Sequence, residues 1–402
     1  MRLLAVSAHY FPRVGGTVNY VHETLSELVG QGVEVELLVP GPAPDGWQPG
    51  GQQPPYGVTW IDAGYPAKGD PGREQRYAFC QKVNEYALKA SEADERPDVV
   101  HVLFGLFVME VLDTARLRAA GVPCLATVHN VPPMECRAIS HDAPPLARLK
   151  EALRLRAVAF KNRTRLKKHN YDLYIVPSEQ VAGLLRPIVG DKVVVIGHGL
   201  TSDLQVQMAP PANRRPDDLL RLLTVGGYVP HKRQHLIPEI AARLKDAGLD
   251  ICWEVAGPPS RVAGYFEGIQ TDIRARGLDD QVILHTAVPF AELGALYDRA
   301  NLYVQPSAEE GFCLTALDAA AVGLPVIGSP AGALPAITKA SGGALIETAP
   351  APLATAIIDF VKKDHWPDAA TQRIKITQAF SWELAAGSLQ KNYRNLVSAA
   401  GR

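Results

Sequence analysis

Two carboxylates stand eight residues apart around a glycine turn: Glu310 directly precedes Gly311, and Asp318 follows in an alanine-rich stretch. Glycine lets a ligand approach the backbone closely. The amides that open the following helix offer hydrogen-bond donors and a partial positive charge to an anion. The spacing therefore predicts a site that accepts a phosphorylated ligand.

The flanking segments predict a strand before this turn and a helix after it. Residues 300–305 have the β-branched and aromatic content of a short buried strand. Residues 316–322 predict an alanine-rich helix that Gly323 and Pro325 end. Glu310 then lies at the carboxyl end of a strand, where open α/β sheets bind ligands.

Asp318 has a second interpretation that its spacing leaves open. Thr315 and Asp318 are three residues apart, as are the N-cap and N3 residues of a capping box. In that role the Asp318 carboxylate would contribute about 0.3–1 kcal/mol through the helix dipole. The pattern predicts a ligand contact for Glu310 and leaves either role for Asp318.

A second glycine turn precedes a group of cationic residues. Gly226 and Gly227 follow an apolar run, and His231, Lys232 and Arg233 come shortly after them. A glycine turn at a strand end with cations nearby predicts a diphosphate site, because charge-assisted hydrogen bonds to phosphate are strong. A solvated basic loop is the alternative.

Two further glycine turns follow predicted strands, at Gly15-Gly16 and at Gly257. Gly15 and Gly16 would let a ligand approach the backbone. Many strand-to-helix connections use glycine only to turn, so a structural role is equally open.

Two histidines are also candidates. His129 follows the β-branched residues Thr127-Val128 and precedes Asn130, which places it at the carboxyl end of a predicted strand. A ligand role and a structural role are both open there. His198 lies at the predicted hinge near the middle of the chain.

The composition excludes several classes of protein. Lys and Arg number 41 against 42 Asp and Glu, so no global field recruits nucleic acid or membrane. The five cysteines form no C-x-x-C pair and are odd in number, which argues against a zinc site and a disulfide framework. No apolar stretch of about 18 residues and no signal-type region is present. We expect a cytoplasmic protein, soluble or peripheral at the inner face of the membrane.

The 402-residue chain predicts two α/β halves. Residues 1–200 form the first and residues 201–378 the second, with a proline-rich linker at 201–216 and a terminal helix in 379–402. Strands alternate with helices in each half, which predicts doubly wound parallel sheets. The predicted strands are 3–8, 33–39, 99–103, 124–128, 174–178 and 192–196 in the first half, and 222–227, 251–255, 282–284, 302–305 and 325–327 in the second.

A basic run lies between residues 148 and 168, where nine Lys or Arg residues stand against the single acid Glu151. A solvated helix face is the commonest meaning of such a run. A docking surface for an acidic acceptor or an anionic membrane is the alternative.

Motifs spread over nearly the whole chain resemble those of the retaining family 4 glycosyltransferases, which have the GT-B fold. The resemblance implies two opposed Rossmann-like domains, with the acceptor bound by the first and the nucleotide-sugar donor by the second, in a cleft between them. The family's last helix crosses back onto the first domain. The motifs are Pro12-x-x-Gly-Gly, Val225 to Lys232, Leu296-Tyr297-x-x-Ala300, Pro306-Ser307, Glu310-Gly-Phe-x-Leu and Phe380-Ser381-Trp382.

The resemblance also implies roles for individual residues. Glu310 is expected to contact the donor sugar, and Asp318 the ribose hydroxyl groups, as the two acids of the family's E-x7-E motif. Lys232 is expected to bind the diphosphate, and His129 to lie near the transferred sugar, so that Glu310 and His129 are the expected catalytic residues. The other expected contacts are Gly16, Gly226, Arg233, Gly311, Phe312, Cys313 and Leu314 for the donor, and Gly15, Thr17 and Asn130 for the acceptor.

Two positions depart from the family pattern. The second acid is Asp318, one methylene shorter than glutamate, and Gly227 stands where the family has an arginine. Arg233 occupies a position that is usually glycine, and we expect it to replace the lost cation.

The implied reaction transfers a sugar from a nucleotide diphosphate to an acceptor hydroxyl with retention at the anomeric carbon, without a metal or other cofactor. Two alternatives are an epimerase or hydrolase on the same architecture and a nucleotide-sugar binding protein with decayed catalysis. The base, the sugar and the acceptor are not specified by the sequence. A small metabolite, a lipid-linked glycan and a polysaccharide are the acceptors considered.

Overall fold

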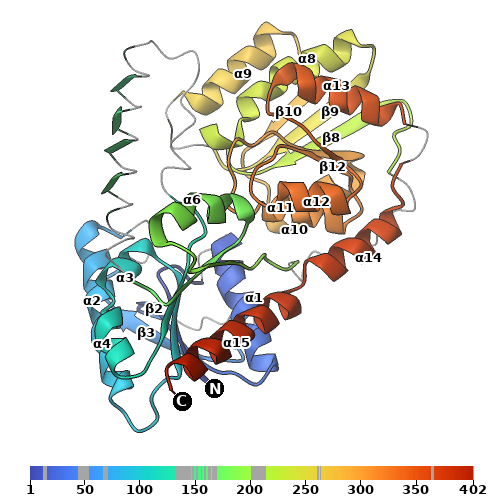
Figure 1. Ribbon diagram of the computed structural model, residues 1–402. Coiled ribbons are helices and arrows are strands. Elements are labelled where there is room, and N and C mark those ends of the chain that lie inside the picture. The colour runs from blue at the N-terminus through green and yellow to red at the C-terminus, as the bar shows by residue number, and fades with distance from the viewer. Residues whose placement is uncertain are drawn as a thin grey trace. The chain divides into compact units, whose positions relative to one another are not determined.

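The chain forms two compact units in the computed structural model (Figure 1). The first consists of Met1–Val131, Phe160–Gly199 and Ser381–Arg402, and the second of Pro132–Ala159 and Leu200–Phe380. The residues that the structure describes are 1–11, 16–43, 54–66, 71–131, 170–200, 214–259, 262, 264–363 and 366–401, with single residues between 146 and 164.

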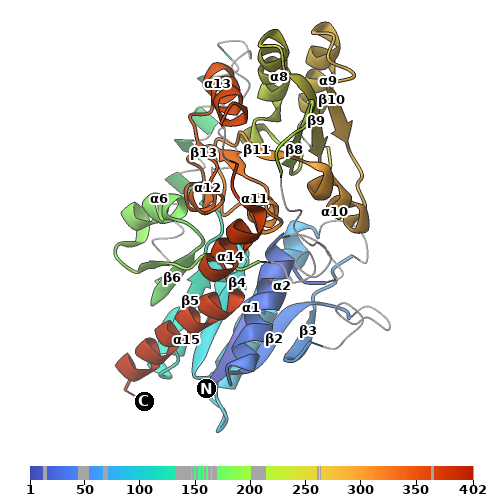
Figure 2. The ribbon, with the colours of Figure 1, turned by 90° about the vertical axis from the view of Figure 1, so that its right-hand side faces the viewer.

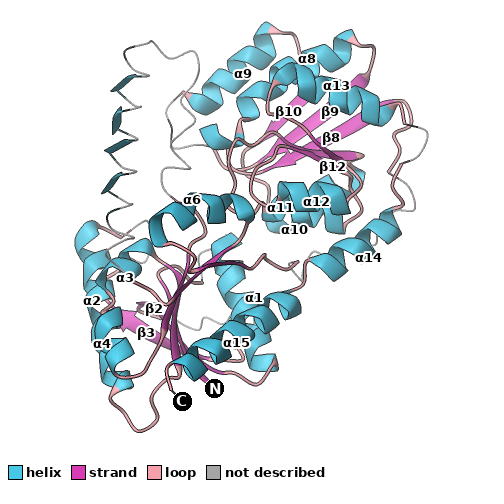
Figure 3. Ribbon diagram, viewed as in Figure 1, coloured by secondary structure: helices cyan, strands magenta, loops and turns pink. Residues whose placement is uncertain are grey.

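The described part of the first unit contains a parallel sheet with the strand order β3-β2-β1-β4-β5-β6-β7 (Figure 3). Ala5 of β1 lies opposite Leu37 of β2 on one side and His101 of β4 on the other. The inner strands are apolar on both faces, as parallel sheets covered by helices require. The strands are β1 (Arg2–Ser7), β2 (Glu34–Gly41), β3 (Gly57–Asp62), β4 (Val99–Phe104), β5 (Cys124–Thr127), β6 (Leu173–Val176) and β7 (Val193–Val195).

Helices α1 (Gly16–Gly30) and α15 (Trp382–Ala399) lie side by side on this sheet (Figure 2). Their apolar side chains join one core with strand residues, among them Leu25 of α1 and Leu389 of α15. The terminal helix therefore belongs to the first unit. The other helices of this unit are α2 (Arg73–Ser91), α3 (Leu106–Val111), α4 (Thr114–Ala119) and α6 (Glu179–Val189).

The second unit has a parallel sheet of its own, which in the described residues has the order β10-β9-β8-β11-β12-β13. One core lies between this sheet and α8, α9 and α13, and another between the opposite face and α10, α11, α12 and α14. The strands are β8 (Leu219–Val225), β9 (Asp250–Ala256), β10 (Val282–His285), β11 (Leu302–Gln305), β12 (Val326–Gly328) and β13 (Ala344–Leu345). The helices are α8 (Ile237–Asp246), α9 (Tyr265–Ala275), α10 (Phe290–Arg299), α11 (Leu314–Ala321), α12 (Leu334–Ala340), α13 (Pro350–Val361) and α14 (Ala369–Ala379).

The predicted strands are all present, with ends that differ by at most three residues. Two strands were not predicted, β3 and β13. β3 is an edge strand whose side chains are only half-buried or exposed, and β13 has only 2 residues. Neither carries the continuous apolar run that marks the inner strands.

None of the helices in the described ranges has the length and hydropathy of a bilayer-spanning segment. The thiols of Cys80, Cys124, Cys252 and Cys313 are free. Cys136 lies outside the described residues.

Gly199 packs directly on the backbone that starts α15. A Cβ atom at this position would lie 2.2 Å from Trp382 N, where no side chain can yield. We expect Gly199→Ala to lower the free energy of unfolding by about 1–3 kcal/mol, as overpacking does. Gly183→Ala is the matched control, because nothing lies within 4 Å of a Cβ on that residue of α6. Equal denaturant midpoints for the two variants would contradict this account.

Candidate active site

Glu310 lies in the loop that joins β11 to α11, and its side chain is buried. Three donors converge on its Oε1 atom: Lys232 Nζ at 2.7 Å, Ser307 Oγ at 2.6 Å and Gln305 Nε2 at 3.4 Å. Within the described part of the chain, Oε2 accepts no hydrogen bond. The carboxylate is thus held through one oxygen and can offer the other to a ligand.

The contact between Lys232 and Glu310 is an ion pair in which Glu310 is buried and Lys232 is half-buried. Burial disfavours both charges, yet the neighbouring Glu310 carboxylate raises the pKa of Lys232 above its usual value. Burial is likewise outweighed at Glu310, whose pKa is lowered by Lys232 and by the Ser307 hydroxyl. Both groups are charged at neutral pH. An ammonium has three N–H donors, so Lys232 can give two of them to a phosphate while it holds Glu310.

A second layer of polar groups orients the donors. Tyr303 Oη is hydrogen-bonded to Gln305 Oε1 at 2.8 Å, which directs Gln305 Nε2 to Ser307 Oγ at 2.7 Å. The hydroxyl of Ser329 donates to the Ser307 carbonyl. Because each of these side chains is buried, the position of the Glu310 carboxylate is fixed from the strand beneath it.

The capping box, one of the two interpretations left open for Thr315 and Asp318, is wrong. The N-cap residue is Cys313, and no side chain caps this helix. Thr315 is the second helical residue, and its Oγ1 donates to the Val225 carbonyl of β8 at 3.0 Å. Cys313 has a φ of 89°, a left-handed conformation that costs a non-glycine residue about 1–3 kcal/mol. Cys313 ends the loop that carries Glu310. The first amides of α11, which follow it, lack acceptors within the helix.

Asp318 lies one turn further along α11 and is half-buried. Its carboxylate makes no hydrogen bond or ion pair with the residues that the structure describes. Burial raises the pKa of its carboxyl group to about 7. With the capping role excluded, Asp318 is a partly accessible acid without a structural partner, which favours a ligand-binding role.

The glycine turn after β8 carries Lys232 to Glu310. Gly226 has a φ of +153°, and a Cβ there would lie 2.9 Å from Lys232 Cδ, so only glycine leaves room for the lysine stem. A Cβ on Gly257 would lie 2.2 Å from the Gly226 carbonyl oxygen. Gln234 Nε2 donates to the carbonyl oxygens of Gly226 and Gly227 at 3.2 and 2.8 Å. The structure thus gives Gly257 and Gln234 the role of supporting this turn.

Arg233 follows Lys232 in a left-handed conformation with a φ of 53°. Its Nη1 donates to the Thr348 carbonyl at 3.0 Å, in the segment just before α13. The Arg233 side chain is therefore bound there and not to the Glu310 carboxylate. Gly227 has room for a side chain, because a Cβ there meets nothing closer than Pro258 at 3.7 Å. The expected compensation by Arg233 stays a prediction.

His129 lies in the first unit, just after β5. Its Nε2–H donates to the Leu103 carbonyl at 3.0 Å. Because a carbonyl can only accept, the neutral ring carries its proton on Nε2 and its lone pair on Nδ1. Burial lowers the pKa of His129 to about 4. The residue therefore offers a hydrogen-bond acceptor at neutral pH, and not a cation.

The remaining predicted residues fall in several places. Gly311, Phe312 and Cys313 form the turn between Glu310 and α11, and Leu314 is the first residue of that helix. Gly16 and Thr17 are the first residues of α1, and Asn130 follows His129. Gly15 lies outside the described residues, as does most of the basic run 148–168.

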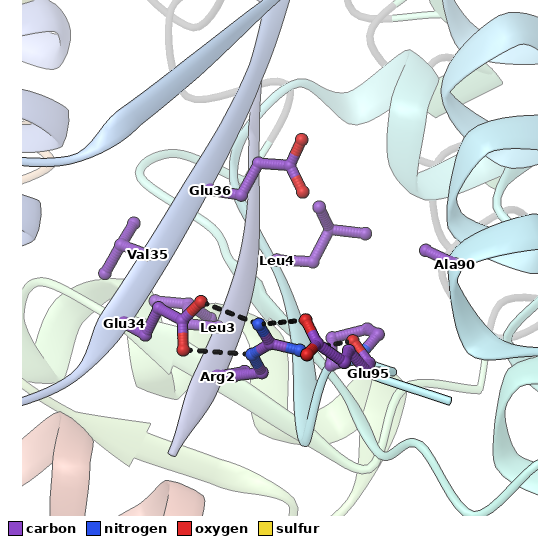
Figure 4. A pocket seen from close by; sticks show the side chains of 9 residues that line it. Arg2, Leu3, Leu4, Glu34, Val35, Glu36, Ala90 and Glu95 are labelled. Atoms are coloured by element: carbon purple, nitrogen blue, oxygen red, sulfur yellow. Dashed lines mark hydrogen bonds and ion pairs between the residues drawn. The ribbon is translucent and has the colours of Figure 1, made fainter. Parts of the chain in front are cut away.

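A separate hollow of about 270 Å³ lies at the other end of the first sheet (Figure 4). It is lined by the first residues of β1 and β2, and Arg2 there pairs with Glu34 at 2.9 Å and Glu95 at 2.7 Å. Ligands of open α/β sheets bind at the carboxyl ends of the strands. This hollow lies at the amino ends, so we do not assign it to the active site.

Two family models match consecutive parts of the chain. The model described as Glycosyl transferase 4-like domain matches residues 15–199, and the one described as Glycosyl transferases group 1 matches residues 207–378. A D-inositol 3-phosphate glycosyltransferase from Arthrobacter sp. (strain FB24) is 26% identical over 400 residues, with 95% of this chain and 90% of the relative covered.

Solved structures share the architecture. Sucrose-phosphate synthase from Thermosynechococcus elongatus has a TM-score of 0.73 at 24% identity, and 99% of each chain is covered. Anabaena HepE in complex with UDP has a TM-score of 0.68 at 14% identity, with 98% of this chain and 100% of HepE covered. With parallel sheets in both units and family models that match residues 15–199 and 207–378, the chain belongs to the family 4 glycosyltransferases of the GT-B fold.

Proposed function

We propose that this glycosyltransferase moves a sugar from a nucleotide diphosphate donor to an acceptor hydroxyl with retention of anomeric configuration and without a divalent metal. The observation that carries the proposal is the Glu310 carboxylate, which is fixed through Oε1 beside Lys232. A diphosphate needs cations and amide donors, and a sugar needs a fixed acceptor. Lys232 offers the cation, and the Glu310 loop offers the carboxylate and the first amides of α11.

Each part of the donor has a candidate partner. Lys232 and the first amides of α11 would hold the diphosphate, because a helix start carries a partial positive charge. Glu310 Oε2 would accept a hydrogen bond from a hydroxyl of the transferred sugar. Asp318 would accept hydrogen bonds from the ribose hydroxyl groups, and the lack of a partner for its carboxylate among the described residues supports this role.

The chemistry requires no protein nucleophile. The bond between the anomeric carbon and the diphosphate oxygen breaks while the acceptor oxygen bonds to the same face of that carbon. The departing phosphate takes the acceptor's proton, so charge and protons balance without a metal or a covalent intermediate. Lys232 would stabilise the negative charge that develops on the leaving diphosphate. His129, neutral with its lone pair on Nδ1, would accept a hydrogen bond near the transferred sugar.

The acceptor is the least constrained part of the proposal. The curated relative from Arthrobacter is named for D-inositol 3-phosphate, so we propose a phosphorylated cyclitol as the first acceptor to test. Lipid-linked glycans and polysaccharides follow. Contact of the basic run 148–168 with an anionic acceptor or membrane is a further proposal, supported by the exposure of Lys150, Arg156 and Lys161.

We expect a thermal-shift panel of UDP, GDP, ADP, CDP and dTDP to select one nucleotide. Its sugar conjugates, incubated with D-inositol 3-phosphate in EDTA, should give an acceptor-dependent product whose anomeric proton coupling matches that of the donor. Glu310→Gln should lower kcat by about 100-fold, as loss of a preorganised electrostatic contact does. Glu267→Gln, on the exposed surface of α9, is the charge-matched control and should leave kcat unchanged.

Other results would support the alternatives. Release of free sugar at the same rate without any acceptor would indicate a hydrolase. Donor binding without turnover over the whole acceptor panel, unchanged in Asp318→Glu, would indicate a binding protein. An inverted product or a requirement for a divalent cation would contradict the proposed chemistry.

The pH dependence of donor binding tests the Asp318 assignment. Because burial raises the pKa of this carboxyl group to about 7, it is mostly protonated at pH 6 and mostly ionised at pH 8. The ionised form accepts hydrogen bonds from ribose more strongly. We therefore expect affinity for the nucleotide sugar to rise up to about tenfold between these pH values, and Asp318→Asn to abolish the rise. An unchanged slope in Asp318→Asn, measured by calorimetry, would exclude this role.

A further inference from the structure

A buried chain of hydrogen bonds crosses the first unit from α15 to α1. Tyr393 Oη of α15 lies 2.6 Å from Nδ1 of His101, and the Nε2 atom of His101 lies 2.8 Å from Thr127 Oγ1. Thr127 Oγ1 lies 3.2 Å from Tyr20 Oη of α1. All four side chains are buried. This series of hydrogen bonds therefore links the phenol of Tyr20 to the terminal helix and holds it in place.

Burial keeps His101 uncharged by lowering the pKa of its imidazole to about 3. One ring nitrogen of a neutral imidazole donates and the other accepts. Hydroxyl groups can do either, so Tyr393 and Thr127 satisfy His101 in both tautomers. The four side chains linked by these hydrogen bonds are all uncharged at neutral pH. Burial also raises the pKa of Tyr20 to about 12 and that of Tyr393 well above its usual value.

A second route joins α15 to the same tyrosine through ring contacts. The indole of Trp382 stacks on His198, with centroids 5.7 Å apart and an interplanar angle of 24°. His198 in turn packs on Tyr20, with centroids 4.7 Å apart. The indole N–H of Trp382 has no acceptor among the described residues, so Trp382 acts here through its ring. Gly199 allows this approach, because its lack of a side chain admits the backbone of Trp382.

Both routes end at His129. The Tyr20 ring meets the His129 imidazole edge to face, with centroids 4.7 Å apart and an interplanar angle of 84°. The His198 ring lies 5.7 Å from the same imidazole. The Phe104 ring lies 5.8 Å from this imidazole, and His129 Nε2 donates to the Leu103 carbonyl. One hydrogen bond leaves a ring free to rotate about it, and the Tyr20, His198 and Phe104 rings limit that rotation.

We propose that Tyr20 is a positioning residue for His129 and that α15, through Tyr393 and Trp382, holds Tyr20 in place. In this proposal the terminal helix α15 helps to position His129, in addition to packing on the sheet. An effect of Tyr20 substitutions on turnover rests on the proposed function of His129. Their effect on the tautomer and protonation of the His129 imidazole does not.

The experiment reads the imidazole directly. Histidines labelled with ¹⁵N report tautomer and protonation by long-range ¹H–¹⁵N correlation, and a His129→Gln spectrum assigns the signal. We expect His129 in the native protein to show the Nε2–H tautomer without titrating between pH 5.5 and 8. Tyr20→Leu, which removes the ring, should give a titrating imidazole or a mixture of tautomers. Tyr20→Phe and Tyr393→Phe, which keep the rings, should shift the His129 resonances without making the imidazole titrate.

Tyr171→Phe is the matched control. It also removes one buried phenol hydrogen bond from the first unit, that to the Met109 carbonyl at 3.2 Å, away from His129. Its His129 signals should match those of the native protein. Identical His129 signals in Tyr20→Leu and Tyr171→Phe would overturn the proposal, whatever the turnover.

Kinetics separate this inference from the proposed function. Tyr20→Leu should lower kcat by about tenfold or more, as small displacements of a positioned group do, while affinity for the nucleotide diphosphate stays unchanged. A changed His129 spectrum with native kcat would support the positioning role of Tyr20 and contradict the catalytic role of His129.

Discussion

The largely buried ion pair between Lys232 and Glu310 is the interaction on which the rest of the second unit's site depends. Two charges taken out of water are costly unless each is paired and hydrogen-bonded. The fold meets this requirement through Ser307 and Gln305, which donate to the same oxygen as Lys232. A buried pair of this kind is a poor source of stability compared with apolar packing. Its position at the carboxyl ends of strands favours a ligand-binding role over a stabilising one.

Two glycines make the approach of these charges possible. Gly226 leaves room for the side chain of Lys232. Gly332 leaves room for that of Glu310, because a Cβ on Gly332 would lie 2.7 Å from Glu310 Cβ. The left-handed Cys313 then turns the chain into α11. The ion pair therefore depends on the missing side chains of Gly226 and Gly332 and on the strained backbone of Cys313. The His129 site of the first unit contrasts with it, because its described groups are neutral aromatic and hydroxyl side chains.

The sequence was sufficient for the strand, turn and helix that carry Glu310, because hydrophobic runs and glycine turns are local signals. It could not reveal that Lys232 and Glu310, 78 residues apart, pair with each other. The capping box was wrong because Thr315 is bound by β8, a tertiary contact that outweighs local spacing. The links from Tyr20 to His101 and Tyr393 were likewise missed, since separations of up to 292 residues leave no periodic pattern.

The most direct test of this account is the affinity of the selected nucleotide diphosphate for Lys232→Met, measured by calorimetry on protein shown to be folded by circular dichroism. The account predicts a loss of about 10-fold or more, since a charge-assisted hydrogen bond to phosphate is worth about 1.5–3 kcal/mol. Lys245→Met, on the exposed surface of α8, should bind as the native protein does. Native affinity in Lys232→Met would contradict the assignment of the Lys232–Glu310 pair to the donor site.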